Sequence, residues 1–343
     1  MRGALIGCGF FAQNHLNAWR DMRTEGVELV AVCDIDPAKA KAAAEAFGVP
    51  RYASDPNALF ETERLDFVDI ATRMETHHDL VLLALRHGVR TIVQKPFAAD
   101  WQQCLAMVEA ARVAGVKLAV HENFRFQAPM RKVREVLASG AIGAPTWARL
   151  TFRTGFDVYK TQPYFHEEEK LAILDVGIHV LDLARVFMGE VRHLSCETQH
   201  RNPLNVGEDT ATMLLRHVSG AVSLVECTYE ARQIPDFFPQ TLVTIEGENG
   251  SIKVHEDFRM VVTSGGRASE TYIGSPLLSW TQEPWHVAQE SVLLTQRTIM
   301  AAWSKDQEAE TSGADNLNTY ALVDAAYAAA ASGRAVAPVA WKG

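Results

Sequence analysis

Up to about residue 123, short apolar runs alternate with stretches of helical periodicity. Strands buried on both faces of a parallel sheet have nearly continuous apolar runs, so this alternation predicts a parallel α/β sheet. The expected strands are residues 3–7, 28–33, 66–71, 90–94 and 117–122, with a shorter one near residues 51–52. The expected helices are residues 10–23, 37–47, 76–87 and 100–114, and the last three are followed by the glycines that usually cap helices, Gly48, Gly88 and Gly115.

From about residue 124 onward, the apolar positions follow a different pattern. A helix that ends at Gly140 precedes longer runs in which apolar and polar residues alternate, as in strands with one buried face. These runs are residues 145–155, 210–218, 221–229, 241–246 and 251–255, and an Asn-Gly pair marks a hairpin between the last two. We expect an open, mostly antiparallel sheet with helices on one face, including a helix at 318–332. The predicted fold class is α/β, with a doubly wound parallel sheet in residues 1–123 and an α+β domain in residues 124–343.

The composition fits two ordinary globular domains and argues against several classes of function. A chain of 343 residues is too long for most single cores. Its net charge of −9 argues against a nucleic-acid partner, which needs clustered positive charge. No apolar run approaches the roughly 20 residues of a membrane span, and the chain enters a strand at once, with no room for a signal peptide. The five cysteines are scattered without a C-x-x-C pair, so we expect no disulfides, no zinc site and a cytoplasmic location.

The strand at residues 3–7 leads into the sequence GCGFFA, residues 7–12. Alone, a G-x-G-x-x-A motif is a weak signal, because glycine pairs are common in turns. Here it follows a strand and opens a helix, so that Gly7 and Gly9, next to Phe10 and Phe11, let the backbone approach a pyrophosphate bound at the helix N-terminus. Asp34 ends the second strand, about 20 residues beyond the motif, which is the spacing of a ribose-binding acid. This order predicts a Rossmann dinucleotide-binding domain rather than a turn without a ligand.

The carboxylate of Asp34 also favours NAD over NADP. A carboxylate accepts hydrogen bonds from ribose hydroxyls but repels a 2′-phosphate, at a cost on the order of a few kcal/mol. NADP sites usually carry an arginine nearby, whereas the stretch CDIDPAK offers only Lys39. We therefore predict NAD as the cofactor.

The first domain contains, in order, the segments GCGFFA, ATRMETHHDL, QKPFA and HENFRF, and LDVGIHVLDLARVFMGE follows at residues 174–190. Together these segments resemble the Gfo/Idh/MocA oxidoreductases, a family of mostly sugar and polyol dehydrogenases, over nearly the whole chain. The resemblance implies that Lys95, Asp175 and His179 are catalytic, and that Gln94 stands where the family has a glutamate. It also implies cofactor contacts from residues that follow the strands of the first domain, namely Thr72, His77, Gln94, Lys95 and Asn123.

The residues alone place Asp175, His179 and Asp182 along one face of an apolar helix that ends at Gly189. These three polar side chains either form hydrogen bonds with solvent and core residues or point into a ligand-binding crevice. The pattern leaves both interpretations open. The resemblance favours the second and implies that Asp175 and His179 face Lys95. Because alcohol oxidation releases a proton, we expect His179 to act as the base, Lys95 to hydrogen-bond the reacting hydroxyl and Asp175 to position both. Exchanged roles of Lys95 and His179 are the alternative.

The resemblance implies a small-molecule sugar or polyol substrate. It would be contacted by Arg125, Asp157 and Tyr159, in addition to Lys95, Asp175 and His179. We expect NAD-dependent oxidation of an aldose at C1 to the lactone, with pentoses among the candidates, or oxidation of a polyol. Two alternatives remain open: a glycosidase that retains NAD and oxidises its substrate transiently, and a non-catalytic dinucleotide sensor. The uncovered sheet face of the family implies a homodimer or homotetramer, and no metal is expected, because the run HEEEK lacks converging ligand spacing.

Overall fold

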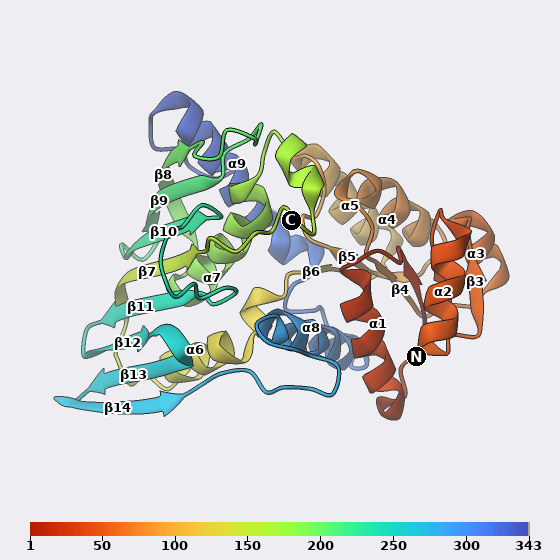
Figure 1. Ribbon diagram of the computed structural model, residues 1–343, viewed down its shortest axis with the longest axis horizontal. Helices are drawn as coiled ribbons and strands as arrows, with labels where there is room; N and C mark the ends of the chain where they lie inside the picture. Colours follow the sequence, from red (N-terminus) through yellow and green to blue (C-terminus); the bar gives the residue numbers. More distant parts are fainter. Residues whose placement is uncertain (342–343) are drawn as a thin grey trace. The chain divides into compact units, whose positions relative to one another are not determined.

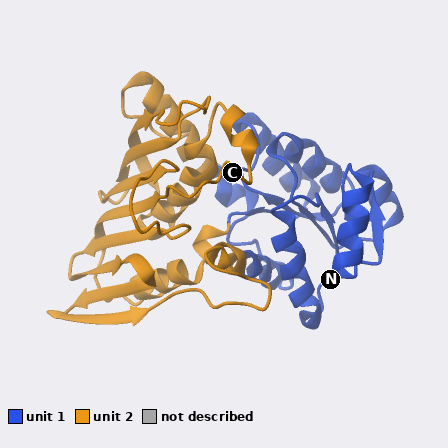
Figure 2. Ribbon diagram, in the orientation of Figure 1, with its two compact units in different colours: residues 1–122, 292–317, 343 blue, residues 123–291, 318–342 orange. Residues whose placement is uncertain are grey.

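The structure is a computed structural model and describes residues 1–341. These form two compact units, coloured separately in Figure 2. Of the described residues, unit 1 consists of 1–122 and 292–317, and unit 2 consists of 123–291 and 318–341. The segment 292–317, which the sequence pattern placed with the second domain, therefore packs within unit 1.

Unit 1 contains the predicted parallel sheet, in the strand order β3-β2-β1-β4-β5-β6. Figure 1 labels β3, β4, β5 and β6 of this sheet. The order reverses between β1 and β4, which is the topological switch point where dinucleotides bind in such sheets. Its strands are β1 (Arg2–Ile6), β2 (Glu28–Cys33), β3 (Arg51–Ala53), β4 (Phe67–Ile70), β5 (Arg90–Gln94) and β6 (Leu118–His121).

The helices within residues 1–122 of unit 1 follow the strands and agree with the sequence pattern except for α3, which was not predicted. They are α1 (Ala12–Asp21), α2 (Pro37–Phe47), α3 (Pro56–Thr62), α4 (His77–Arg86) and α5 (Trp101–Ala114). Asp36 and Asp55 each accept a hydrogen bond at 2.9 Å from the backbone N–H two residues on, and a proline follows each of them. The Asp-Pro pair thus starts both α2 and α3.

Unit 2 is built on a sheet with the order β14-β13-β12-β11-β7-β10-β9-β8. Its neighbouring strands are antiparallel except β7 and β10, as the prediction of a mostly antiparallel sheet requires. The strands are β7 (Pro145–Arg153), β8 (Val191–Gln199), β9 (Thr210–His217), β10 (Val222–Thr228), β11 (Leu242–Gly247), β12 (Gly250–Val254), β13 (Arg259–Ser264) and β14 (Arg267–Tyr272). Strands β8, β13 and β14 were not predicted, and β14 is exposed along its whole length, so it carries no alternation of buried and exposed positions.

Helices cover one face of this second sheet. α7 (Ile178–Met188) packs on the central strands β7 and β10, and α6 (Ala128–Ala138) packs against α7. Alternate side chains such as Leu150, Leu215 and Val225 are buried on the covered face, whereas Leu214 on the opposite face is 53% exposed. The predicted one-sided helical layer is therefore confirmed.

Two long helices complete the chain, α8 (His286–Trp303) and α9 (Gly313–Ser332). The sequence pattern did not show α8, because several buried positions in it are polar, among them Ser291, Thr295 and Gln296. Within residues 1–341, no helix has the length and apolar character needed to cross a membrane.

Candidate active site

The loop between β1 and α1 leaves room for a ligand. Gly7 has a φ of +97°, and a Cβ placed on it would lie 2.5 Å from the carbonyl oxygen of Ala71, so the position requires glycine. A Cβ on Gly9 would meet no atom within 4 Å, so the backbone there borders open space. Phe10 is 61% exposed beside it, and the α1 N-terminus follows. This open, glycine-lined helix start fits the pyrophosphate of a dinucleotide.

Asp34 links that loop to the end of β2. Its Oδ2 accepts a hydrogen bond from the Cys8 N–H at 2.7 Å, and its Oδ1 accepts one from the Asp36 N–H at 2.9 Å. The carboxylate is only partly buried, and each oxygen keeps acceptor capacity for further donors. Ribose hydroxyls fit this acceptor-only group, whereas a phosphate does not.

Thr72 and His77 connect the ends of β4 and β5. His77 is fully buried, with Nε2 3.2 Å from the Thr72 carbonyl oxygen and Nδ1 3.0 Å from that of Pro96. Burial lowers the pKa of His77, although the hydrogen bonds to these carbonyls act to raise it. The net lowering of the pKa favours the neutral ring. The Lys95–Pro96 peptide bond is cis. His77 therefore fastens the turn that follows Lys95 and does not itself face solvent.

Lys95 is half-buried directly after β5. Gln94, the last residue of β5, accepts the Lys95 backbone N–H on its Oε1 at 2.7 Å. The amide of Gln94 also reaches His15, a fully buried residue of α1 that the sequence analysis did not single out. A polar residue inside an apolar helix pattern needs a buried partner, which was the signal available for His15.

Asp175 and His179 belong to unit 2, where the predicted helix begins differently from expectation. Residues Ile173–Gly177 form a π-helical turn that contains Asp175, and α7 with His179 follows. The Asp175 Oδ2 accepts a hydrogen bond from the Tyr229 hydroxyl, which burial and the Asp175 charge keep protonated by raising its pKa. His179 is 3% exposed and stacks on Phe124, with ring centroids 3.9 Å apart and planes 1° from parallel. Both side chains are thus held in fixed orientations.

The structure places Arg125 and Asn123 inside unit 2. Arg125 is 3% exposed and donates to both carboxylate oxygens of Asp182, with Nε 2.8 Å from Oδ2. Asn123 is equally buried and donates to the Ser291 Oγ at 2.7 Å. These contacts make Arg125 and Asn123 anchors for the segment HENFRF, which carries Phe124 under the His179 ring.

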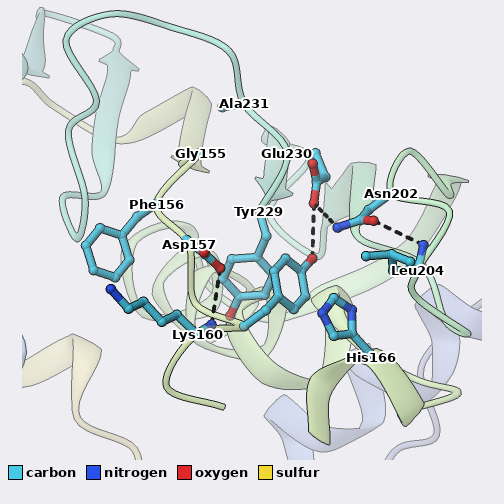
Figure 3. A pocket seen from close by; sticks show the side chains of 11 residues that line it. Gly155, Phe156, Asp157, Lys160, His166, Asn202, Leu204, Tyr229, Glu230 and Ala231 are labelled. Carbon is cyan, nitrogen blue, oxygen red and sulfur yellow. Dashed lines mark hydrogen bonds between the residues drawn. The ribbon is translucent and has the colours of Figure 1, made fainter. Parts of the chain in front are cut away.

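Asp157 and Tyr159 line a polar pocket of about 560 Å³ in unit 2 (Figure 3). The other lining residues are Gly155, Phe156, Lys160, His166, Asn202, Leu204, Tyr229, Glu230 and Ala231. The Tyr159 hydroxyl accepts from Asn205 at 2.8 Å and donates to the Glu230 Oε1 at 3.2 Å. Glu230 also accepts from Asn202 at 3.0 Å. Burial raises the pKa of Tyr159 to about 12, so its hydroxyl remains a donor.

Besides Asp157 and Tyr159, which were predicted from the sequence, this pocket contains residues that were not predicted. Tyr229 lines it and also holds Asp175, so the two sets of unit 2 residues are connected by one hydrogen bond. Tyr229 and Glu230 directly follow β10, and Asn202 lies in a loop without any motif. No sequence signal marked them. Among residues 1–341, no three histidine, cysteine or acidic side chains are grouped in a way that could hold a metal ion.

Family profiles match both parts of the chain. Residues 1–122 match an "Oxidoreductase family, NAD-binding Rossmann fold", and residues 130–253 match a "GFO/IDH/MocA C-terminal domain". Two D-apiose dehydrogenases, from Paraburkholderia graminis and Rhizobium rhizogenes, are each 46% identical to this chain. Both alignments span 98% of this chain, and they span 89% and 97% of the two relatives, respectively. A crystal structure of an oxidoreductase from Agrobacterium radiobacter in complex with NAD+, L-tartaric acid and magnesium is also 46% identical, with a TM-score of 0.96 and 98% of both chains covered.

Proposed function

This chain belongs to the GFO/IDH/MocA family and is an NAD-dependent sugar dehydrogenase; from that premise, we propose that its substrate is D-apiose or a closely similar five-carbon aldose, oxidised at C1 to the lactone. The observation that carries the proposal is the 46% identity over 98% of the chain to two D-apiose dehydrogenases. These relatives give no support to a glycosidase or a non-catalytic sensor. The polar lining of the unit 2 pocket supports a ligand rich in hydroxyl groups.

We assign the proton transfer to His179, Lys95 and Asp175. When bound, NAD+ would accept the hydride from C1 of the sugar. The proton of the C1 hydroxyl passes to the protein. His179 takes that proton, because a histidine titrates near neutral pH and Phe124 fixes its ring. Lys95 donates a hydrogen bond to the reacting oxygen, and Asp175 orients the substrate and His179. Exchanged roles of Lys95 and His179 remain the alternative assignment.

The contacts of the sugar are assigned to the pocket of Figure 3. Tyr159, Glu230 and Asn202 form a hydrogen-bonded row whose carboxylate and amide groups suit neutral hydroxyls. Cofactor contacts are assigned to Gly7, Gly9 and the neighbouring Phe10 and Phe11, with Asp34 on the ribose. Thr72, His77, Gln94 and Asn123 complete the cofactor side, His77 through the turn that it fastens.

The proposed substrate is tested by NADH formation with NAD+ or NADP+ and a panel of D-apiose, D-ribose, D-xylose, D-glucose and myo-inositol. We expect the highest kcat/KM with D-apiose, and a preference for NAD+ of at least about tenfold, because Asp34 repels a 2′-phosphate. The product should be a lactone that hydrolyses slowly to the acid. Faster turnover of myo-inositol than of any aldose would contradict oxidation at C1.

We also propose that the chain forms a homodimer or homotetramer through the open face of the unit 2 sheet. Leu214 on β9 is 53% exposed there and lies directly opposite Leu224 on β10, which is also partly exposed. Light scattering should give a mass of two or four chains for the wild type and a lower mass for Leu214→Lys. Val113→Lys introduces the same charge at a 72% exposed position of α5 and should leave the mass unchanged. A monomeric wild type would refute the assembly.

The compartment is assigned from the cysteines. All five, Cys8, Cys33, Cys104, Cys196 and Cys227, are buried and free of disulfides. Burial raises the pKa of Cys8 to about 12 and that of Cys33 to about 11, so neither is a reactive thiolate. Five thiols that form no disulfide fit a reducing compartment, and we propose the cytoplasm.

A further inference from the structure

A chain of buried hydrogen bonds lies behind Lys95 in unit 1. Asp69 on β4 and His15 on α1 are fully buried, and Gln94 at the end of β5 is 7% exposed. The His15 Nδ1 lies 2.7 Å from the Asp69 Oδ2, and the His15 Nε2 lies 3.0 Å from the Gln94 Nε2. The Gln94 Oε1 accepts the Lys95 N–H at 2.7 Å. A buried carboxylate is thereby connected to the backbone of the lysine that follows the sheet.

These contacts determine where the protons are. A backbone N–H can only donate, so the atom of Gln94 that faces Lys95 is the carboxamide oxygen. The amide nitrogen of Gln94 is then a donor toward His15, whose Nε2 must accept and carries no proton. The ring proton lies on Nδ1 and is donated to Asp69. His15 is therefore neutral and in a single tautomer.

The groups around His15 are consistent with this arrangement. The Asp69 Oδ2 also accepts a hydrogen bond from the Trp19 Nε1 at 2.7 Å, so this buried oxygen has a donor besides His15. Gln296 on α8 reaches the same oxygen at 3.4 Å. The ring of His121 on β6 lies 4.3 Å from that of His15, and burial lowers the pKa of His121 to about 3, so it adds no charge near neutral pH.

We propose that Gln94 is a positioning residue for Lys95, and that a glutamine at this position keeps His15 neutral. The positioning part rests on the catalytic role proposed above for Lys95. A glutamate, which the family pattern has here, would place a second acceptor oxygen against the lone pair of the His15 Nε2. That contact is satisfied only by an added proton, which makes His15 an imidazolium between two carboxylates. The side chain at position 94 therefore selects between a neutral and a charged network beneath the same lysine.

The protonation is tested by NMR of the full chain with ¹⁵N-labelled histidine, and the His15 signals are assigned by their loss in His15→Gln. We expect one protonated and one unprotonated ring nitrogen in the wild type and two protonated nitrogens in Gln94→Glu near neutral pH. Gln102→Glu adds the same charge at an exposed position of α5 and should leave the His15 signals unchanged. A wild-type His15 protonated on Nε2, or an unchanged ring in Gln94→Glu, would overturn the assignment.

The positioning role is tested by kinetics with NAD+ and the preferred sugar. Gln94→Met removes both hydrogen bonds at similar volume and should lower kcat by about 10- to 100-fold, with a smaller change in the KM for NAD+. In Gln94→Glu, kcat should fall as the pH rises, because the proton added to the His15 network is lost. The wild type and Gln102→Glu should show no such fall in kcat at alkaline pH. An unchanged kcat in Gln94→Met refutes the positioning role. Undiminished activity in Lys95→Ala would instead refute the role of Lys95, and the NMR result on His15 would stand.

Discussion

Replacing Lys95 by methionine is expected to lower kcat by about 10²- to 10⁴-fold, the range typical of lost general acid–base groups. Lys95 follows β5 directly, at the carboxyl edge of the parallel sheet where ligands of such folds bind. The Gln94 Oε1 holds the Lys95 backbone N–H by a hydrogen bond at 2.7 Å. Methionine keeps the length and apolar stem of lysine but removes its donors, so folding and NAD+ binding should persist while turnover falls.

The matched variant is His179→Asn, which should lose a similar factor for a different reason. Asparagine retains a hydrogen-bonding side chain beside Phe124 but cannot accept a proton near neutral pH. NAD+ affinity, measured by fluorescence or calorimetry, should change by less than about threefold in both variants, because the loss concerns proton transfer. A loss of NAD+ binding that matches the loss of kcat would contradict a role in the chemical step.

The pH dependence of kcat decides which of the two residues is the base. The wild-type rate should fall at acidic pH, where the base is protonated before it can act. If His179 is the base, His179→Asn loses this acidic limb, whereas Lys95→Met keeps it at a lower rate. The opposite pattern assigns the base to Lys95 and makes His179 the donor. Either pattern leaves the dehydrogenase activity in place and settles only the division of roles.

The sequence was sufficient for the parallel sheet and its glycine loop, because both depend on local patterns. β1, the GCGFFA loop and Asp34 follow one another within the first 34 residues, although the close approach that requires glycine at position 7 comes from Ala71, which is distant in the sequence. The segments that were missed lack such patterns. α8 carries buried polar residues that interrupt its helical periodicity, and β14 has no buried side at all.

The candidate site was only partly predictable for the same physical reason. Asp157 and Tyr159 came from a family segment, and the structure places both in one pocket. Glu230, which accepts from the Tyr159 hydroxyl, and Asn202, which donates to Glu230, lie far from Tyr159 in the sequence and come together only through folding. Arg125 shows the converse: a cation in a family segment suggested a substrate contact, but its guanidinium is occupied by Asp182, a partner 57 positions later. A single sequence does not reveal such pairings.

Replacing Asp182 by alanine is expected to destabilise the protein by about 3–5 kcal/mol, because it leaves a buried guanidinium without its counterion. Asp182 is fully buried and accepts from both Arg125 and Thr319, the latter at 2.6 Å, with Arg185 3.7 Å away. Urea denaturation measures the change in the free energy of unfolding. Glu135→Ala removes a carboxylate from the exposed Lys132 pair on α6, and it should cost no more than about 1 kcal/mol.

The double variant Arg125→Met Asp182→Leu distinguishes an unpaired charge from a lost contact. If the cost of Asp182→Ala is the uncompensated guanidinium, removing both charges should recover most of the stability, since apolar replacements of buried ion pairs are often neutral.

Burial acts to raise the pKa of Asp182, but Arg125 outweighs it, so the folded-state pKa is lower than that of the unfolded chain, about 3.9. A depressed folded pKa contributes stability above the unfolded value and loses it as the pH falls through the folded one. The difference between wild type and Asp182→Ala should therefore be constant from about pH 7 to pH 5 and narrow below about pH 4. A difference that is already lost at pH 6 would show that another group, and not this carboxylate, carries the effect.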